Sequence, residues 1–212
     1  NVYLVPHDED CIGVLNTTTN IFSTIATGLT ARYKFQGAAV VGTKVYFAPC
    51  YEDDIGVLDT LTNTFSTIPT GLTGGNKFSG ACAVGATVYF IPKSENNIGV
   101  LDTSTDAFIT IDTGLTGNYK FCGAAALGNK LYMAPWNQND IGVLDTATNT
   151  FTTIATGLIG LNKFSGAAAV GRKVYFAPCW EDNVGVLDTV TNTFSTIAAG
   201  LTGDYNFNGA IT

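Results

Sequence analysis

Residues 34–76 read KFQGAAVVGTKVYFAPCYEDDIGVLDTLTNTFSTIPTGLTGGN, and close copies of this stretch follow one another along the whole chain. The copies stay in step without a gap at a spacing of 43 residues, as shown by Val2, Val45, Val88, Leu131 and Val174. A fixed period of this length indicates a repeat architecture, in which each copy is one supersecondary unit that packs against its neighbours.

Each copy contains the pattern of four short strands, which the second copy places at residues 35–41, 45–48, 55–59 and 65–68. These segments are rich in β-branched and aromatic residues and are bounded by turn signals. Gly42-Thr43 suits the positive φ that a two-residue hairpin needs at its first position. The DTxTN stretch between the third and fourth strands is rich in residues that bond their own backbone.

The apolar runs VYFA and IGVL are continuous, which predicts that both faces of each sheet are covered. One copy cannot cover its own faces, so neighbouring copies must do so. The small GAAA segment fits strands that are crowded around a narrow axis, which makes the first strand innermost. The sequence therefore predicts an all-β fold, a closed five-bladed β-propeller of four-stranded blades that spans residues 1–212 as a single domain.

The two ends of the chain carry complementary parts of one copy. Asn1 matches Lys44, and residues 207–212 match the first strand, so that only the positions of Val41-Gly42-Thr43 are missing. We expect Phe207–Thr212 to pair with Val2–Val5 and to close the ring without a free sheet edge.

Charge and hydropathy exclude several classes of partner. The net charge of −7 has the wrong sign for attraction to nucleic acid or to anionic lipid. No apolar run approaches the roughly 18 to 20 residues of a membrane-spanning helix. One glycosylation sequon, Asn16-Thr17-Thr18, favours a secreted or extracellular location, and no other feature of the sequence indicates a compartment. We expect the protein to be a monomer.

Signatures of catalysis and of metal binding are missing from the sequence. The single histidine is His7, and no HExxH, CxxC, GxSxG or phosphate-binding loop occurs. The five cysteines have neither disulfide nor zinc spacing. We predict no catalytic residue, no metal and no cofactor, and hence a protein that is not an enzyme.

The strings VYFAP, IGVLDT and GAAAVG resemble kelch-like propeller repeats. The fivefold count resembles the five-bladed tachylectin-type lectins, a resemblance that implies binding of amino sugars between blades. No sugar-contacting residue of that family is carried over to a position in this chain.

Variation among the copies is concentrated in the loops after the second and fourth strands, which share one side of a meander ring. These loops offer aromatic, carboxylate and amide groups beside one another, which is the mixture that sugar binding needs. The candidate ligand-binding residues are Tyr33, Tyr51, Glu52, Asp53, Tyr119, Trp136, Asn139, Trp180, Glu181, Asp182 and Tyr205.

The same side offers residues for two other kinds of site. Lys34, Lys77, Lys120 and Lys163, with Asn206 in the fifth place, suit an anion at the channel mouth, although exposed pairs with Glu9, Glu52, Glu95 and Glu181 explain them better. The loops HDEDC and CYEDD offer carboxylates to calcium but lack the EF-hand spacing.

The sequence thus favours a rigid platform whose variable loops bind a ligand, with glycans ahead of another protein. A protein-interaction scaffold is the main alternative and predicts a broad apolar patch instead of small pockets. A recently amplified repeat whose loops drifted without any site is the other alternative.

Overall fold

The computed structural model describes residues 1–210, in which all regular secondary structure is β. Its strands are β1 (Val2–Leu4), β2 (Cys11–Asn16), β3 (Ile21–Ala26), β4 (Phe35–Val41), β5 (Lys44–Pro49), β6 (Asp54–Asp59), β7 (Thr64–Pro69), β8 (Phe78–Val84), β9 (Thr87–Pro92), β10 (Asn97–Asp102), β11 (Ala107–Asp112), β12 (Phe121–Leu127), β13 (Lys130–Pro135), β14 (Asp140–Asp145), β15 (Thr150–Ala155), β16 (Phe164–Val170), β17 (Lys173–Pro178), β18 (Asn183–Asp188) and β19 (Thr193–Ala198).

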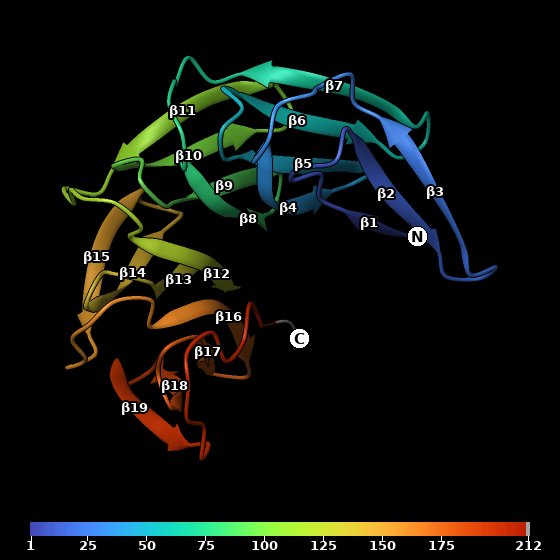
Figure 1. Ribbon diagram of the computed structural model, residues 1–212. Helices are drawn as coiled ribbons and strands as arrows, with labels where there is room; N and C mark the ends of the chain where they lie inside the picture. The colour runs from blue at the N-terminus through green and yellow to red at the C-terminus, as the bar shows by residue number, and fades with distance from the viewer. Residues whose placement is uncertain (211–212) are drawn as a thin grey trace. The chain divides into compact units, whose positions relative to one another are not determined.

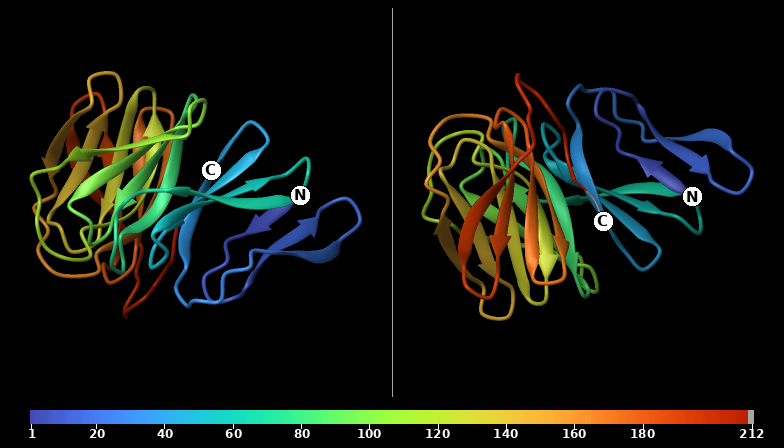
Figure 2. Two further views of the ribbon diagram at one scale, coloured as in Figure 1. Left: turned by 90° about the horizontal axis from the view of Figure 1, so that it is seen from above. Right: turned by 90° about the horizontal axis from the view of Figure 1, so that it is seen from below.

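Each copy of the repeat forms one antiparallel sheet whose strands follow chain order (Figure 1). Strands β4–β7, β8–β11, β12–β15 and β16–β19 make four-stranded sheets, and β1–β3 make a three-stranded one. Figure 2 shows the same meanders from two further sides. The four strands predicted in the second copy are confirmed; β5, β6 and β7 begin one residue earlier than predicted, and β5 and β7 also end one residue later.

Both predicted turns form as their residues require. Gly42 adopts a φ of 59° in the β4–β5 hairpin, and Asn63 adopts 54° in the β6–β7 turn. In the latter turn, the Asp59 carboxylate accepts hydrogen bonds from the backbone N–H groups of Leu61 (2.9 Å) and Thr62 (3.3 Å). Because these bonds satisfy the turn backbone locally, the fourth strand folds back directly onto the third.

The contacts divide the chain into two compact units, Asn1–Phe90 with Val100–Ile109, and Ile91–Gly99 with Thr110–Thr212. In each unit the core lies between neighbouring sheets. Phe78 and Phe90 pack against Tyr46 and Ile55 in the first unit, and Phe164 packs with residues of β13 and β14 in the second. The prediction that both faces of the second and third strands are covered is confirmed, since the interiors of β5 and β6 are buried.

Neighbouring sheets approach most closely through their first strands, β4 beside β8 and β12 beside β16. A Cβ on Gly37 would lie 2.8 Å from the Cα of Gly80. The small residues of the GAAA segment are therefore required by the close approach of two backbones.

The predicted pairing of residues 207–212 with residues 2–5 stays a prediction. Residues 207–210 form no strand, and Ile211 and Thr212 lie outside the described residues. Residues 1–210 contain no helix long and apolar enough to cross a membrane.

Candidate functional site

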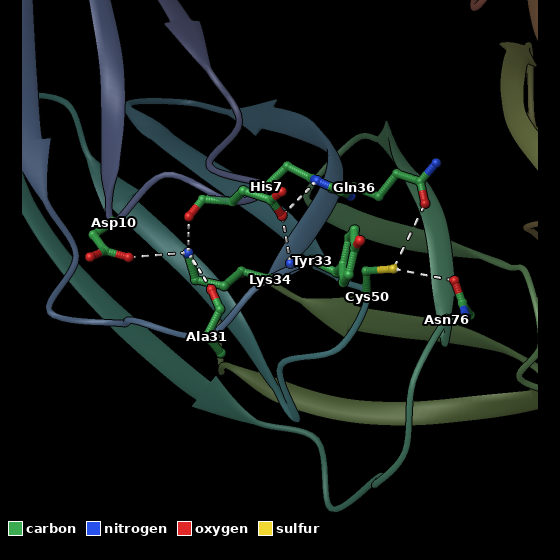
Figure 3. Close-up of polar contacts among 9 residues, drawn as sticks. His7, Asp10, Ala31, Tyr33, Lys34, Gln36, Cys50 and Asn76 are labelled. Carbon is green, nitrogen blue, oxygen red and sulfur yellow. Dashed lines mark hydrogen bonds and ion pairs between the residues drawn. The ribbon is translucent and has the colours of Figure 1, made fainter.

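The loops after the second and fourth strands of a copy lie on one side of their sheet and bond to each other (Figure 3). The backbone N–H of Tyr33 donates to Asp8 Oδ1 at 3.0 Å, and Lys34 Nζ donates to the carbonyl of Asp8 at 3.1 Å. This arrangement confirms that the two most variable loops share a side, which we call the loop side.

A buried lysine anchors the loop side in four of the five copies. Lys34, Lys120 and Lys163 are 0% exposed and Lys77 is 2% exposed. The ammonium of Lys120 donates to the carbonyls of Ser94 (3.2 Å) and Gly117 (2.6 Å) and to Asn96 Oδ1 (3.3 Å). In the fifth copy the Asn206 side chain takes this role and donates to the Glu181 carbonyl at 3.1 Å.

The interpretation of these lysines as exposed is therefore wrong. Lys34 forms an ion pair with Asp10 (3.5 Å) and Lys77 with Asp53 (3.0 Å), which are aspartates and not the expected glutamates. Burial lowers the pKa of Lys120 and of Lys163, and the charges of Glu95 and Glu181 partly offset this effect. Because the ammonium groups are enclosed by loop carbonyls, they serve the fold and are not available to bind an anion.

Backbone hydrogen bonds continue the connection from copy to copy. The carbonyl of Trp136 accepts from the N–H of Lys163 at 3.0 Å, and the carbonyl of Lys163 accepts from the N–H of Cys179 at 2.8 Å. The loop backbones are thus held at both ends, so that the side chains they carry project from a fixed frame.

The residue before each anchoring position adopts a left-handed backbone, with φ from 53° to 58°. Asparagine occupies two of these positions, Asn76 and Asn162, and tolerates the conformation well. The other three hold a tyrosine that is exposed by 45% (Tyr33), 40% (Tyr119) and 68% (Tyr205). For a bulky residue this backbone is strained, and each of these tyrosines nevertheless keeps at least 40% of its surface exposed.

Two of the predicted aromatic residues meet in the first unit. The rings of Tyr33 and Tyr51 lie 5.4 Å apart, and His7 contacts Tyr33 edge to face at 5.1 Å. Asn76 Nδ2 donates to the Tyr51 hydroxyl at 3.0 Å, and the Tyr51 ring covers Gly75. We call His7, Tyr33 and Tyr51 the first aromatic cluster.

A second cluster forms in the other unit. Trp180 and Tyr205 stack edge to face with ring centroids 5.6 Å apart, and Trp180 is 39% exposed. The adjacent Glu181 has its pKa raised by burial, an effect that the charge of Lys163 opposes. Tyr119 has a different partner, the ammonium of Lys93, which lies 5.2 Å from its ring centroid.

The remaining predicted residues are not gathered into one site. The Asp53 carboxylate forms an ion pair with Lys77. Trp136 is half-buried, and its backbone forms hydrogen bonds with the backbones of Lys120 and Lys163. Glu52 is half-buried, whereas Asn139 and Asp182 are exposed on the loop side.

The sequence did not predict that His7 contacts the Tyr33 ring, because a lone histidine in an acidic loop is usually solvated.

Residues 1–210 contain no group of three or more histidine, cysteine, aspartate or glutamate side chains that could hold a metal ion. The five cysteines, all within residues 1–210, form no disulfide. Burial raises the pKa of the Cys122 thiol to about 11 and also raises the pKa of Cys179. Such thiols are poor nucleophiles at neutral pH.

No protein-family model matches the chain, and no curated protein matches its sequence. Its structure is similar to virginiamycin B lyase from Staphylococcus aureus, with 15% identity, a TM-score of 0.78 and coverage of 91% of this chain and 64% of the lyase. A streptogramin B lyase has 19% identity and a TM-score of 0.76, with coverage of 95% of this chain and 66% of the lyase. A chain of the nidogen/laminin complex has 16% identity and a TM-score of 0.71, with coverage of 99% of this chain and 81% of the other.

At these identities the similarity shows the fold alone, which is that of a β-propeller with five repeated sheets. The chain spans about two thirds of the length of both lyases. The kelch-like and tachylectin-type resemblances find no support among these structures.

Proposed function

We propose that this protein is a non-catalytic binding protein that holds a carbohydrate against the aromatic clusters of its loop side. The observation that carries the proposal is the strained backbone of Tyr33, Tyr119 and Tyr205, whose rings remain exposed. Asn76 and Asn162 demonstrate that the fold itself does not need tyrosine at this position. A bulky side chain kept at a conformational cost and in contact with solvent fits a role in binding.

The chemistry of the clusters favours a sugar over a flat apolar ligand. The faces of Tyr51 and Trp180 can stack on sugar C–H groups, while Glu52, Asp182 and Asp204 lie in the adjoining loops as hydrogen-bonding groups. The two clusters occur in different copies of the repeat, so that a multivalent glycan is the natural class of ligand.

The first experiment is a glycan array with the full chain, with and without calcium, in which hits are competed with free sugar. Tyr33→Asn, Tyr205→Asn and the double variant should weaken binding of the hit at least about tenfold, because each removes a ring from a cluster. Leu61→Ala, which is 75% exposed in the β6–β7 turn, is the matched control and should bind normally. Unchanged binding by the double variant would contradict the assignment of the site.

The same substitutions should weaken binding but stabilise the fold. Replacing a tyrosine that has a left-handed backbone conformation with asparagine should raise the free energy of unfolding by about 1 kcal/mol, and Asn162→Tyr should lower it by a similar amount. Urea denaturation measures both. A destabilised Tyr33→Asn variant would mean that the ring is needed for the fold, and the argument from strain would then fail.

A protein partner is the second candidate, because one similar propeller was solved in the nidogen/laminin complex. This candidate is supported if the protein binds no glycan on the array and the tyrosine variants lose binding to a protein ligand. Turnover of virginiamycin B is measured as a further control. We expect none, and turnover would contradict the non-catalytic assignment.

A further inference from the structure

Two of the three loop-side tyrosines are contacted by a basic side chain of their own copy. The ammonium of Lys93 lies 5.2 Å from the centroid of the Tyr119 ring. His7, which holds the position of Lys93 in the first copy, contacts Tyr33 with ring centroids 5.1 Å apart. An ammonium within about 6 Å of a ring centroid is attracted by the negative face of the ring. The repeat itself therefore shows a basic group as the partner of a tyrosine at this position.

The fifth copy keeps the same geometry without the basic group. Cys179 holds the position of Lys93, and burial raises the pKa of its thiol, so that it is neutral at pH 7. The backbone N–H of Asn206 donates to the Cys179 carbonyl at 2.8 Å, and the backbone N–H of Lys120 donates to the Lys93 carbonyl at 2.7 Å. The loops thus meet in the same way in both copies, but in the fifth copy the Tyr205 ring is 68% exposed.

Trp180 supplies a second ring beside Tyr205. The two rings meet edge to face with centroids 5.6 Å apart and an interplanar angle of 85°, and Trp180 is 39% exposed. In the third copy Ser94 holds the position of Trp180, so that Tyr119 has no such neighbour at this position. Two exposed rings set nearly at a right angle resemble the aromatic cages that bind ammonium ions.

The charges beside the second cluster also favour a cation. The loop residues 179–182 and 203–206 contain no lysine, arginine or histidine but three acidic residues, which are Glu181, Asp182 and Asp204. The charge of the buried Lys163 acts on Glu181, whereas Asp182 and Asp204 are exposed. Carboxylates near the rings attract a cation and repel an anion.

We propose that the second cluster, Trp180 with Tyr205, binds the ammonium group of an organic cation, which takes the place that the Lys93 ammonium has on Tyr119. The inference rests on the proposed function, because it uses the same cluster as a binding site, and it adds the charge of the ligand. A carbohydrate that binds there carries a free, protonated amine.

Choline and its neutral isostere, in which a carbon atom replaces the quaternary nitrogen, test the proposal in NMR titrations of the full chain. At constant ionic strength, choline should shift the signals of the Trp180 indole N–H and the Tyr205 amide. The isostere should bind at least about fivefold more weakly, because it lacks the charge that the rings and carboxylates attract. Equal binding of the two probes, or binding of neither, would overturn the proposal.

Substitutions that copy other repeats locate the site. Cys179→Lys places a lysine where the third copy has Lys93 and should abolish the choline shifts, whereas the matched control Cys179→Ser should keep them. Tyr205→Asn copies Asn162 and should weaken choline binding at least about fivefold, a result that does not depend on whether Cys179→Lys folds. Unchanged binding of choline by Tyr205→Asn would overturn the proposal.

The glycan array separates this inference from the proposed function. Choline binding at the second cluster together with an empty array would support the cation site and contradict the carbohydrate ligand. A neutral glycan whose binding requires Tyr205, with no binding of choline, would support the proposed function and overturn the cation site.

Discussion

The buried lysines show how a single charged residue can organise a loop. Lys120 has its ammonium fully enclosed and donates to two carbonyls and one amide oxygen from two different loops. Burial costs free energy, which is why the pKa of Lys120 is lowered, but each donated bond satisfies a loop acceptor that would otherwise lose its water. The lysine therefore acts as a structural cross-link between two loops.

Lys120→Met should lower the free energy of unfolding by about 1–3 kcal/mol, because methionine fills the space but leaves the three acceptors without a donor. Lys173→Met makes the same chemical change at an exposed site and should stay within about 0.5 kcal/mol of the parent. Urea denaturation at pH 7 gives both values. Equal effects of the two substitutions would refute the cross-linking role.

The Lys120 substitution also has a definite pH dependence. Since burial lowers the lysine pKa in the folded chain below the ordinary 10.5, the unfolded chain binds more protons between the two values. The parent chain therefore gains stability from this group as pH rises towards 10.5, and Lys120→Met lacks that gain. The difference between the two proteins should be larger at pH 9.5 than at pH 7, and a constant difference would count against the lowered pKa.

Cys122 provides a second test at the scale of the residue. A pKa of about 11 in place of 9.0 reduces the thiolate fraction at pH 8 roughly 100-fold, so alkylation by iodoacetamide should slow by the same factor. Peptide mass spectrometry over time measures the rate, with the chain unfolded in urea as the control. Similar rates in the folded and unfolded chains would show that the thiol is not shielded.

Among the elements, the strands and turns could be predicted from the sequence because their signals are local. The Gly42 hairpin and the Asp59 turn depend on residues within four positions of each other. The burial of Lys34 was not predictable in this way, because the groups that enclose it include Asp8 and Asp10, more than 20 residues earlier. The pairing of Tyr33 with Tyr51 depends likewise on two copies of the repeat meeting in space, although both residues were predicted as candidates.

The third strand of each copy of the repeat contains a glycine whose role also depends on a distant residue. A Cβ on Gly142 of β14 would lie 2.8 Å from Phe121 Cζ and 3.1 Å from Phe151 Cε2. Gly142→Ala should therefore lower the free energy of unfolding by about 1–3 kcal/mol, because two packed rings must move. Gly128→Asn, in a turn with open space around its Cα and a φ of 62°, is the control and should be nearly neutral. A neutral Gly142→Ala variant would show that the rings are less tightly packed than the distances indicate.

At the scale of the whole molecule, the order of strands along the chain is separable from their order in the sheets. If residues 207–212 pair with residues 2–5, as the sequence predicts, then a permuted chain that runs from 203 to 212, through an inserted Val-Gly-Thr, and on to residues 1–202 makes the first sheet from four consecutive strands. The insertion copies Val41-Gly42-Thr43, whose glycine already adopts the φ of 59° that the hairpin needs.

This permuted chain should fold with the parent's circular dichroism spectrum and unfold at the same temperature or a higher one. The reason is that a hairpin of three inserted residues brings the strand to its sheet at a lower entropic cost than closure across the whole chain. A permuted chain that aggregates, or that unfolds several degrees below the parent, would show that the first sheet does not take its missing strand from residues 207–210.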